Sequence, residues 1–368
     1  MSTAVKLSES TNTQDLRATG PLPADHPPVA QRHIGVLLVN LGTPDAPTPG
    51  AVRRYLAEFL SDTRIVDYPR FFWLPILHGV ILNVRPAKTA KAYASIWHQE
   101  TDESPLRYYT RVLCEKLAGD NANASVIFDW AMRYGNPSVA SRINQLKEQG
   151  CDRLVIIPMY PQYSSTTTAS VNDAVFAALS KMKWQPAIRT APAFHDDAAY
   201  IAALGVRIKE TLAQSDHTPE RFILSFHGLP ERLLPEGDPY HCHCAKTARL
   251  LREHMGWSEE YAPLTFQSRF GPEKWLGPAT DDMINKAARD GVKHIAVITP
   301  GFTADCIETL EEIGIEAAHE FKDAGGESFQ LIPCLNDSPA MLEVMRGLID
   351  RELAGWCDQP VPMAANKF

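Results

Sequence analysis

Short apolar runs alternate with longer segments of helical periodicity from residue 34 onward. Each short run predicts a strand that is buried on both faces of a sheet. These runs lie at 34–40, 126–130, 154–159, 222–226, 295–299 and 329–332. Patterns that repeat every three to four residues predict helices near 51–60, 87–97, 138–149, 196–213, 243–255 and 306–321. Strands that alternate with helices are typical of α/β domains with parallel sheets.

Two parts of the chain resemble each other. Residues 36–44 match 222–230, and residues 150–158 match 291–300, in both cases as an apolar run that ends near a proline. The repeat predicts two similar doubly wound, Rossmann-like halves, with chance similarity between strand–proline turns as the alternative. The first half carries an insertion that contains the apolar segment 71–82, and long insertions after a strand often form lids.

Composition narrows the class of protein. With 45% hydrophobic and 22% charged residues, 368 residues suffice for two ordinary domains. A net charge of −8 without a basic run argues against nucleic-acid binding. Seven scattered cysteines indicate a reducing compartment, so we expect the protein in the cytoplasm.

Neither the N-terminal region nor the apolar segment 71–82 has the pattern of a membrane-spanning helix. Residues 1–32 are rich in Ser, Thr, Pro and Ala, which predicts a disordered tail rather than a secretory signal. The apolar segment 71–82 is too short to cross a bilayer and is interrupted by Pro75. Its aromatic residues suggest the hypothesis that segment 71–84 makes peripheral contact with a membrane.

His227 follows a predicted strand directly, and Gly228 and Pro230 then force a turn. Ligands of open α/β sheets bind beyond the carboxyl ends of the strands, so His227 is a candidate for proton transfer or metal binding. The alternative is a strand-end residue that only hydrogen-bonds a loop. The other strand-end loops are rich in aromatic and apolar side chains, which suits a large, flat, apolar ligand. The dinucleotide and phosphate-loop fingerprints are absent.

Two clusters allow a structural and a functional interpretation. Asp305 and Glu308 have capping-box spacing, with Asp305 bonding the amides of the first turn. Alternatively Glu308 and Glu312 carry metal in or protons out, while Glu316 and Glu320 lie on a solvated face. The run His241–Cys244 favours the start of a helix over a metal site, because the other cysteines stand singly.

Five motifs together resemble the ferrochelatase family, in its bacterial form, from about residue 34 to about residue 354. The motifs are 39–44, 160–164, 225–230, 267–271 with Trp275 and Leu276, and 302–310. The resemblance implies insertion of ferrous iron into protoporphyrin IX, the last step of haem synthesis. It also implies a chelatase-like fold with the porphyrin cleft between the two halves.

The resemblance also implies roles for individual residues. His227 and Glu308 match the catalytic pair and iron site. Residues that match porphyrin-binding positions are Leu41, Arg85, Tyr93, Ser104, Arg133, Tyr134 and Trp275. Asp305, Glu312 and Glu316 match an acidic path for metal or protons. A [2Fe-2S] cluster is not favoured, because the C-terminal region holds only Cys357 and Ser164–Thr166 lack the cysteine of animal members.

The patterns and the resemblance together predict the domain organisation. We expect a tail at 1–32, a first α/β domain at 33–186 with a lid at about 61–105, and a second domain at 187–336. A helix at 337–356 returns to the first domain, and 357–368 form a tail. Open alternatives for the function are a chelatase for coproporphyrin, cobalt or nickel, and a non-catalytic haem or porphyrin carrier.

Overall fold

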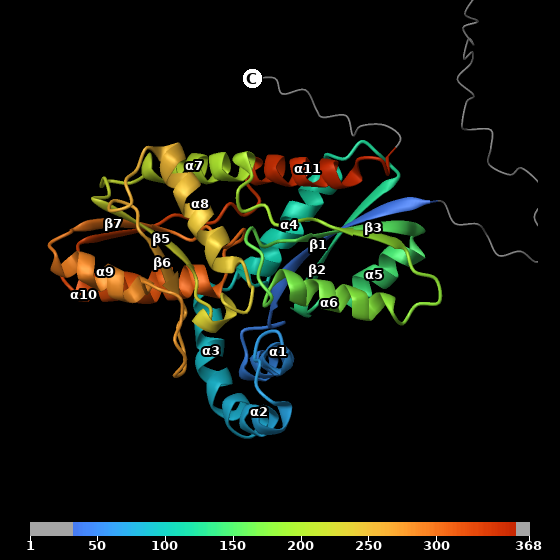
Figure 1. Ribbon diagram of the computed structural model, residues 1–368, viewed down its shortest axis with the longest axis horizontal. Helices are drawn as coiled ribbons and strands as arrows, with labels where there is room; N and C mark the ends of the chain where they lie inside the picture. Colours follow the sequence, from blue (N-terminus) through green and yellow to red (C-terminus); the bar gives the residue numbers. More distant parts are fainter. Residues whose placement is uncertain (1–31, 358–368) are drawn as a thin grey trace, which may run out of the picture. The chain divides into compact units, whose positions relative to one another are not determined.

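Eight strands form two parallel sheets that have the same order of strands. The computed structural model describes residues 32–357, so most of the two expected tails, 1–31 and 358–368, lies outside the described residues. The first sheet has the order β2-β1-β3-β4 and the second β6-β5-β7-β8 (Figure 1). The strands are β1 (His33–Thr43), β2 (Val126–Gly135), β3 (Cys151–Pro158), β4 (Ala187–Thr190), β5 (Arg221–His227), β6 (Leu264–Gln267), β7 (His294–Ile298) and β8 (Ser328–Leu331).

The equivalent positions of the strands confirm the two similar halves. β1 and β5 carry the first repeated motif, β3 and β7 carry the second, and each pair occupies the same place in its sheet. All six predicted strands are present, whereas β4 and β6, each of four residues, were not predicted. Both are edge strands with a weak apolar pattern, so the hydrophobic signal there is low.

Helices cover both faces of each sheet. In the first half they are α1 (Pro49–Ser61), α2 (Arg70–Ile76), the π-helix η2 (Leu77–Ile81), α3 (Leu82–Ile96), α4 (Pro105–Gly119), α5 (Val139–Glu148) and α6 (Thr168–Leu179). From residue 187 onward they are α7 (Ala198–Leu212), the short η3 (Glu231–Leu233), α8 (Tyr240–Met255), α9 (Thr280–Arg289), the π-helix η4 (Ile307–Ala317), α10 (Ala318–Asp323) and α11 (Pro339–Leu353).

Alternate residues of β1 point to two different cores. Val36 and Leu38 enter a large cluster shared with β5, β7, α4, α7, α8 and α11, whereas Leu37 and Val39 pack against α5 and α6. In the second half Ile223 of β5 faces α9, η4 and α10. The shared cluster joins both sheets through one continuous apolar core, which fixes the two halves against each other.

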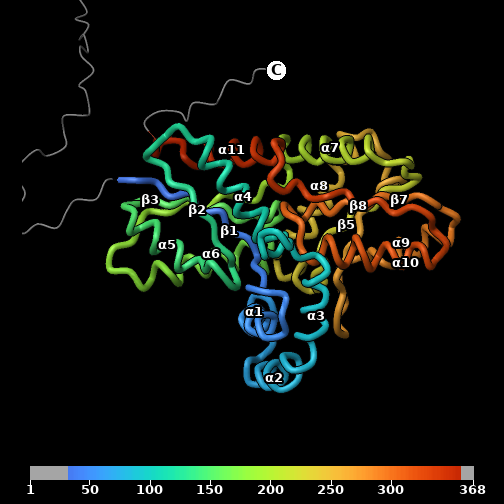
Figure 2. Tube along the Cα trace, turned by 180° about the vertical axis from the view of Figure 1, so that it is seen from behind, coloured from blue at the N-terminus to red at the C-terminus, as the bar shows by residue number. Residues whose placement is uncertain are grey.

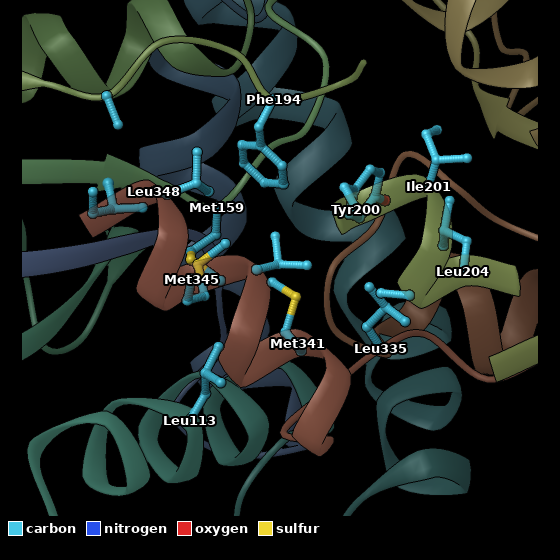
Figure 3. Close-up of a cluster of buried hydrophobic side chains, with 14 of the residues drawn as sticks. Leu113, Met159, Phe194, Tyr200, Ile201, Leu204, Leu335, Met341, Met345 and Leu348 are labelled. Carbon is cyan, nitrogen blue, oxygen red and sulfur yellow. The ribbon is translucent and has the colours of Figure 1, made fainter. Parts of the chain in front are cut away.

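Helix α11 lies at the centre of the shared core. Its residues Met341, Met345 and Leu348 pack between Leu113 of α4 and Tyr200 of α7 (Figure 3). The helix therefore contacts elements of both halves, including β3 and α4 of the first. In Figure 2, α11 and α7 lie on the side of the sheets opposite to α1, α2 and α3.

The insertion of the first half lies between β1 and β2. There the chain forms α1, α2, η2, α3 and α4, whereas only η3 and α8 lie between β5 and β6. The segment predicted as a lid, about 61–105, packs through Leu77, Leu82 and Tyr93 on α1 and on Tyr134. None of the helices between residues 32 and 357 has the length and apolar character needed to cross a bilayer.

Candidate active site

His227 is the last residue of β5 and lies half-buried at the carboxyl edge of the second sheet. Its Nδ1 lies 2.6 Å from the carbonyl oxygen of Gly228. Because a carbonyl can only accept, Nδ1 carries the proton in the neutral ring and Nε2 keeps a free lone pair. The ring can therefore accept a proton or bind a metal ion through Nε2.

Because Gly228 has no side chain, the Gln267 carbonyl and the Trp275 ring can lie close to the backbone next to His227. Its amide donates to the carbonyl of Gln267 at 2.8 Å, and a Cβ at this position would lie 2.7 Å from that same oxygen. The Trp275 ring would be 3.1 Å from the same Cβ, so the indole packs directly on the glycine. Trp275 thereby becomes a half-buried apolar wall next to His227, with Phe270 at a ring distance of 4.8 Å.

Glu308 lies in the first turn of η4, half-buried. Gln267 connects this turn to His227, because Gln267 is the β6 partner of His227 in the sheet. The Gln267 side-chain amide donates to the backbone carbonyl of Glu308 at 2.7 Å. Its oxygen accepts from the Ser225 hydroxyl at 2.7 Å, which holds the amide in this orientation. One side chain thus fixes the histidine strand and the glutamate helix relative to each other.

The acidic residues of η4 pass from a buried to an exposed environment. Burial raises the pKa of Glu312, and Glu308 raises it further, while Ser268 and His227 act in the opposite direction. Its carboxylate accepts a hydrogen bond of 2.6 Å from the Ser268 hydroxyl. Glu316, four residues on, is exposed. A π-helix has more than four residues per turn, so carboxylates four positions apart stay close to one line.

Asp305 does not cap this helix, which corrects the capping-box interpretation. The cap is Cys306, whose amide donates to the Thr309 hydroxyl at 3.0 Å, one position later than predicted. The buried Asp305 carboxylate instead accepts from Asn336 at 2.7 Å and from Thr309 at 3.1 Å. These bonds hold η4 against the loop that precedes α11.

Leu41, Tyr93 and Ser104 come together on the first-half side of the site. Leu41 packs against both the lid core and the cluster around Cys306. Tyr93 and Ser104 line a small cavity together with Glu308. Burial and the nearby Glu308 raise the pKa of the Tyr93 phenol, which therefore keeps its proton at neutral pH. Arg85 is exposed on α3.

Arg133 and Tyr134 belong to a polar network at the end of β2. Arg133 forms an ion pair with Asp62 and donates to the Ser170 carbonyl at 2.8 Å. The Tyr134 hydroxyl donates to Asp62 at 2.8 Å. Burial alone would raise the pKa of Asp62, but the Arg64 amide, Tyr134 and Arg133 outweigh it and lower the value.

Several residues of the site carry no signal in the sequence as single positions. Asp62 and Ser170 stand far apart in the chain, and nothing in their local pattern indicates a network with Arg133. Gln267 lies within a resembling motif, but its bond to Glu308 depends on the register of β5 and β6. Asp238, which accepts from the Ser165 amide at 2.7 Å, also joins the two halves without a local signal.

The run His241–Cys244 forms the first turn of α8, as the helical interpretation predicted. Cys242 is exposed whereas Cys244 is buried, and His243 stacks on His195 at a ring distance of 3.7 Å. Within residues 32–357 no group of three or more His, Cys, Asp or Glu side chains is arranged to hold a metal ion.

Solved structures of low identity share the fold. SirB from Bacillus subtilis with Fe3+ has a TM-score of 0.53 at 12% identity, with 88% of this chain and 96% of that chain covered. The sirohydrochlorin chelatase SirB from Bacillus subtilis subspecies spizizenii in complex with cobalt has a TM-score of 0.50 at 11% identity, over 88% and 95% of the two chains. Both confirm the α/β fold of two parallel sheets.

Sequence relatives are much closer. The ferrochelatase of Agrobacterium fabrum is 55% identical over 336 residues, which cover 91% of this chain and 98% of that protein. The ferrochelatase of Allorhizobium ampelinum is 54% identical with the same coverage, and that of Brucella ovis is 52% identical over 326 residues, 88% of this chain and 92% of that protein. The family model described as Ferrochelatase matches residues 33–353. The chain therefore belongs to the ferrochelatase family, as its five motifs predicted.

Proposed function

We propose that the protein inserts ferrous iron into protoporphyrin IX at His227 and Glu308, which gives protoheme and two protons. Iron insertion into protoporphyrin is the metal-insertion lyase reaction of haem biosynthesis that goes with this family. The observation that carries the residue assignment is the position of Gln267, which pairs with the His227 strand and bonds the backbone of Glu308. A base and a carboxylate held in one frame suit a reaction that exchanges ring protons for a cation.

The two residues have complementary tasks in this reaction. The porphyrin must lose two pyrrole N–H protons while Fe²⁺, which is the substrate metal, sheds water and reaches the ring nitrogens. His227 accepts a proton or binds the iron through its free Nε2. The Glu308 carboxylate offsets the positive charge of the incoming cation.

An acidic path leads from the reaction to solvent. Glu312 lies behind Glu308, with its pKa raised chiefly by burial, and Glu316 follows at the surface. Carboxylates in this order pass iron inward or protons outward in single steps of one helical turn. Asp305 contributes by holding the start of η4 through Asn336 and Thr309.

The porphyrin lies between walls from both halves in this proposal. Leu41 and Trp275 supply apolar contact, and tight walls favour a bent ring whose nitrogens are open to the metal. Arg85 on α3 binds a propionate, with Tyr93 and Ser104 behind it. Arg133 and Tyr134 support the wall through their network with Asp62.

Anaerobic uptake of Fe²⁺ into protoporphyrin IX, followed by absorbance, tests the function. We expect turnover by the wild type, and for His227→Ala or Glu308→Gln a loss of turnover with porphyrin binding retained. His217→Ala, an exposed histidine of the same half, is the matched control and should turn over normally. Porphyrin binding without metallation by the wild type would contradict the proposal and favour another metal, another porphyrin or a carrier.

We further propose that the protein works in the cytoplasm and that its lid touches anionic membranes. Phe71 and Val84 are 71% exposed and Phe72 is 63% exposed. Large apolar side chains are rarely exposed to this extent, close together, on a helix surface that faces only water. Between Tyr68 and Gln99 the chain has four Lys or Arg residues and no Asp or Glu, although the whole chain carries a charge of −8. Apolar side chains flanked by cations fit an anionic lipid surface.

Sedimentation with vesicles tests the membrane contact. The wild type should co-sediment with vesicles of phosphatidylglycerol, and the variant Phe71→Ser/Phe72→Ser should not. Phe176→Ser, which removes a 51% exposed aromatic residue on α6, serves as the control. Equal sedimentation of all three proteins would rule out this role of the lid.

We propose that the protein lacks a [2Fe-2S] cluster. Cys242 is exposed whereas Cys244, Cys306 and Cys334 are buried, and Cys306 packs in an apolar cluster with Leu106 and Ala304. Iron and acid-labile sulfide analysis of anaerobically purified protein tests this. Stoichiometric sulfide would contradict the proposal.

A further inference from the structure

Arg232, in the short helix η3, lies at the centre of a network of ion pairs. Its guanidinium is close to three carboxylates, those of Asp67 at 3.2 Å, Glu236 at 3.3 Å and Glu273 at 3.1 Å. Glu236 and Glu273 belong to the second half, whereas Asp67 lies between α1 and α2 of the first half. Of the ion pairs in the described part of the chain, Arg232–Asp67 alone joins the predicted lid to the second half.

The loop between β6 and α9 carries Trp275 and is bonded to the segment that leads into η3. The Glu231 amide donates to the Lys274 carbonyl at 2.8 Å, and the Leu276 amide donates to the Leu229 carbonyl at 2.9 Å. One bond thus lies on either side of Trp275. These bonds join the Trp275 loop and η3 into one unit, so a contact with η3 also acts on the apolar wall of the site.

The tip of the predicted lid is held weakly by packing. None of the residues 67–76, which include α2, is buried. The Trp73 indole donates to the Leu60 carbonyl at 2.6 Å, which ties this tip to the end of α1. Few buried apolar contacts are typical of segments that open locally. The pair Asp67–Arg232 therefore acts on a part of the chain that little else holds against the second half.

The rest of the molecule leaves this tip as the part that can move. The shared apolar core joins the two sheets, so the two halves do not open as rigid bodies. The base of the predicted lid, α3, contacts η4. A large, flat ligand that enters or leaves the cleft therefore displaces the tip and the loop of Trp275.

We propose that Arg232 is a latch between the two walls of the cleft. Through Asp67 it holds the tip of the predicted lid closed on the second half, and this pair opens when a porphyrin enters or leaves. The inference deepens the proposed function and rests on it for the identity of the ligand. Arg232 is a positioning residue, because it acts through the two walls and does not touch the reacting atoms.

The network makes the opening reversible. When Asp67 moves away, Glu236 and Glu273 remain partners of Arg232, so the open state does not leave the guanidinium unpaired. A groove of about 390 Å³ beside Arg232 gives the guanidinium room to turn between these partners. The pair with Asp67 is exposed, and exposed ion pairs contribute little free energy each, which suits a contact that must break in every cycle.

Asp67→Asn tests the latch, because it removes the charge on the side of the predicted lid and leaves Arg232 in place. Stopped-flow fluorescence of protoporphyrin IX should show that association and dissociation both become about fivefold faster, as expected for the loss of one exposed ion pair of a network. Kd should stay the same, because the latch closes both the free and the loaded protein. Single-turnover metallation of bound porphyrin should keep its rate.

Two further variants separate the latch from a general effect of charge. Glu236→Gln is the matched control, because it removes a carboxylate from the same guanidinium but within the second half. Both rates should then stay as in the wild type. Arg232→Gln should have the faster rates of Asp67→Asn, and the double variant should be no faster than either single variant.

Hydrogen exchange of residues 67–76 without porphyrin measures the latch independently of the ligand. These amides should exchange faster in Asp67→Asn than in the wild type and in Glu236→Gln. Equal exchange in all three proteins, or unchanged porphyrin rates in Asp67→Asn, overturns the inference. Faster dissociation with unchanged association also overturns it, because Asp67 would then contact the bound porphyrin rather than gate it. If exchange differs as expected but the wild type binds no protoporphyrin IX, the proposed function fails while the latch remains.

Discussion

The Tyr240 hydroxyl donates a hydrogen bond of 3.0 Å to the backbone carbonyl of His227. Tyr240 is the first residue of α8, and its amide donates a hydrogen bond of 3.0 Å to the Asp238 carboxylate. Asp238 in turn accepts from the amide and the hydroxyl of Ser165, in the loop that follows β3 of the first half. The position of His227 therefore depends on both halves of the molecule.

Tyr240→Phe should lower kcat while porphyrin binding is retained. The change removes one hydroxyl, so stability should fall by about 1 kcal/mol, and His227 gains freedom at the end of β5. Steady-state metallation and thermal unfolding measure the two effects. Tyr261→Phe is the matched control, because it removes a hydroxyl that bonds the Pro219 carbonyl at 2.9 Å outside the candidate site. A similar loss of kcat in both variants would show that the bond to His227 has no special role.

Gly228→Ala should damage both stability and turnover. The new Cβ would lie 2.7 Å from the Gln267 carbonyl and 3.1 Å from Trp275, so either the turn after His227 or the indole wall must move. Overpacking of this kind costs about 1–3 kcal/mol. Chemical denaturation and the porphyrin-induced quenching of tryptophan fluorescence report the two effects. Gly119→Ala, where a Cβ meets nothing within 4 Å, should leave both unchanged or add stability. If Gly228→Ala matched that control, the close approach would not constrain the site.

Hydrophobic patterns predicted the inner strands well because β1, β3, β5 and β7 are buried on both faces. The apolar run at 222–226 needs only burial to form a strand, and Ile223 and Leu224 indeed face different cores. The edge strands β4 and β6 lack this signal, because each has only four residues and some of these are polar, such as Thr265 and Gln267 of β6.

Sequence patterns and the family resemblance named candidate residues for the site, but they did not predict how these residues are arranged in space. His227 follows from its strand and turn, yet its bond to Tyr240 and its link to Glu308 through Gln267 depend on contacts between distant segments. The π-helical form of η4 also escapes a sequence pattern, because a four-residue spacing of glutamates fits an α-helix almost as well. The cap moved from Asp305 to Cys306 because Asn336, 31 positions away, engages the Asp305 carboxylate.

Asp62→Asn should destabilise the protein strongly, because it leaves the guanidinium of Arg133 without its counter-charge. Both side chains are largely buried, with 13% and 16% exposure, and breaking such a pair costs about 3–5 kcal/mol. Asp173→Asn breaks the exposed pair with Arg64 and should cost no more than about 1 kcal/mol. Urea unfolding of both variants at neutral pH measures the difference. Equal, small effects would mean that the polar network of Arg133 does not support the wall of the site.

The same pair predicts a pH dependence. The pKa of Asp62 is lower in the folded protein than its ordinary value, because hydrogen bonds and Arg133 outweigh burial. Its contribution to stability is therefore complete above the ordinary pKa and disappears as the pH falls through the lower folded value. In Asp62→Asn this acid-sensitive part of the stability should be missing, and an unchanged acid limb would contradict the assignment.

The stacked pair His195–His243 should make the protein sensitive to mild acid. Burial, and then the neighbouring His243, lower the pKa of His195 to about 4, while Asp196 acts in the opposite direction and Lys246 adds to the lowering. Burial also lowers the pKa of His243, whose Nδ1 accepts from the Tyr163 amide at 3.2 Å. An unfolded histidine takes up a proton near pH 6.5, whereas the folded pair does so only at lower pH. Stability should therefore fall as the pH drops from about 6.5 toward about 4.

Thermal unfolding between pH 7 and pH 4.5 tests this, with His195→Phe as the variant that keeps a ring in the stack and removes one titrating group. The wild type should lose on the order of 5 °C in Tm over this range beyond the loss of His195→Phe, since a change of 1 kcal/mol shifts Tm by a few degrees in a chain of this size. His217→Asn, from the more exposed pair His217–His294 with rings 4.5 Å apart, is the control and should follow the wild type. Parallel curves for the wild type and His195→Phe would mean that acid sensitivity arises elsewhere. If Tm of His195→Phe instead depends less on pH than Tm of the wild type, the acid sensitivity arises at the contact between the loop after β4 and the first turn of α8. That turn also carries Tyr240.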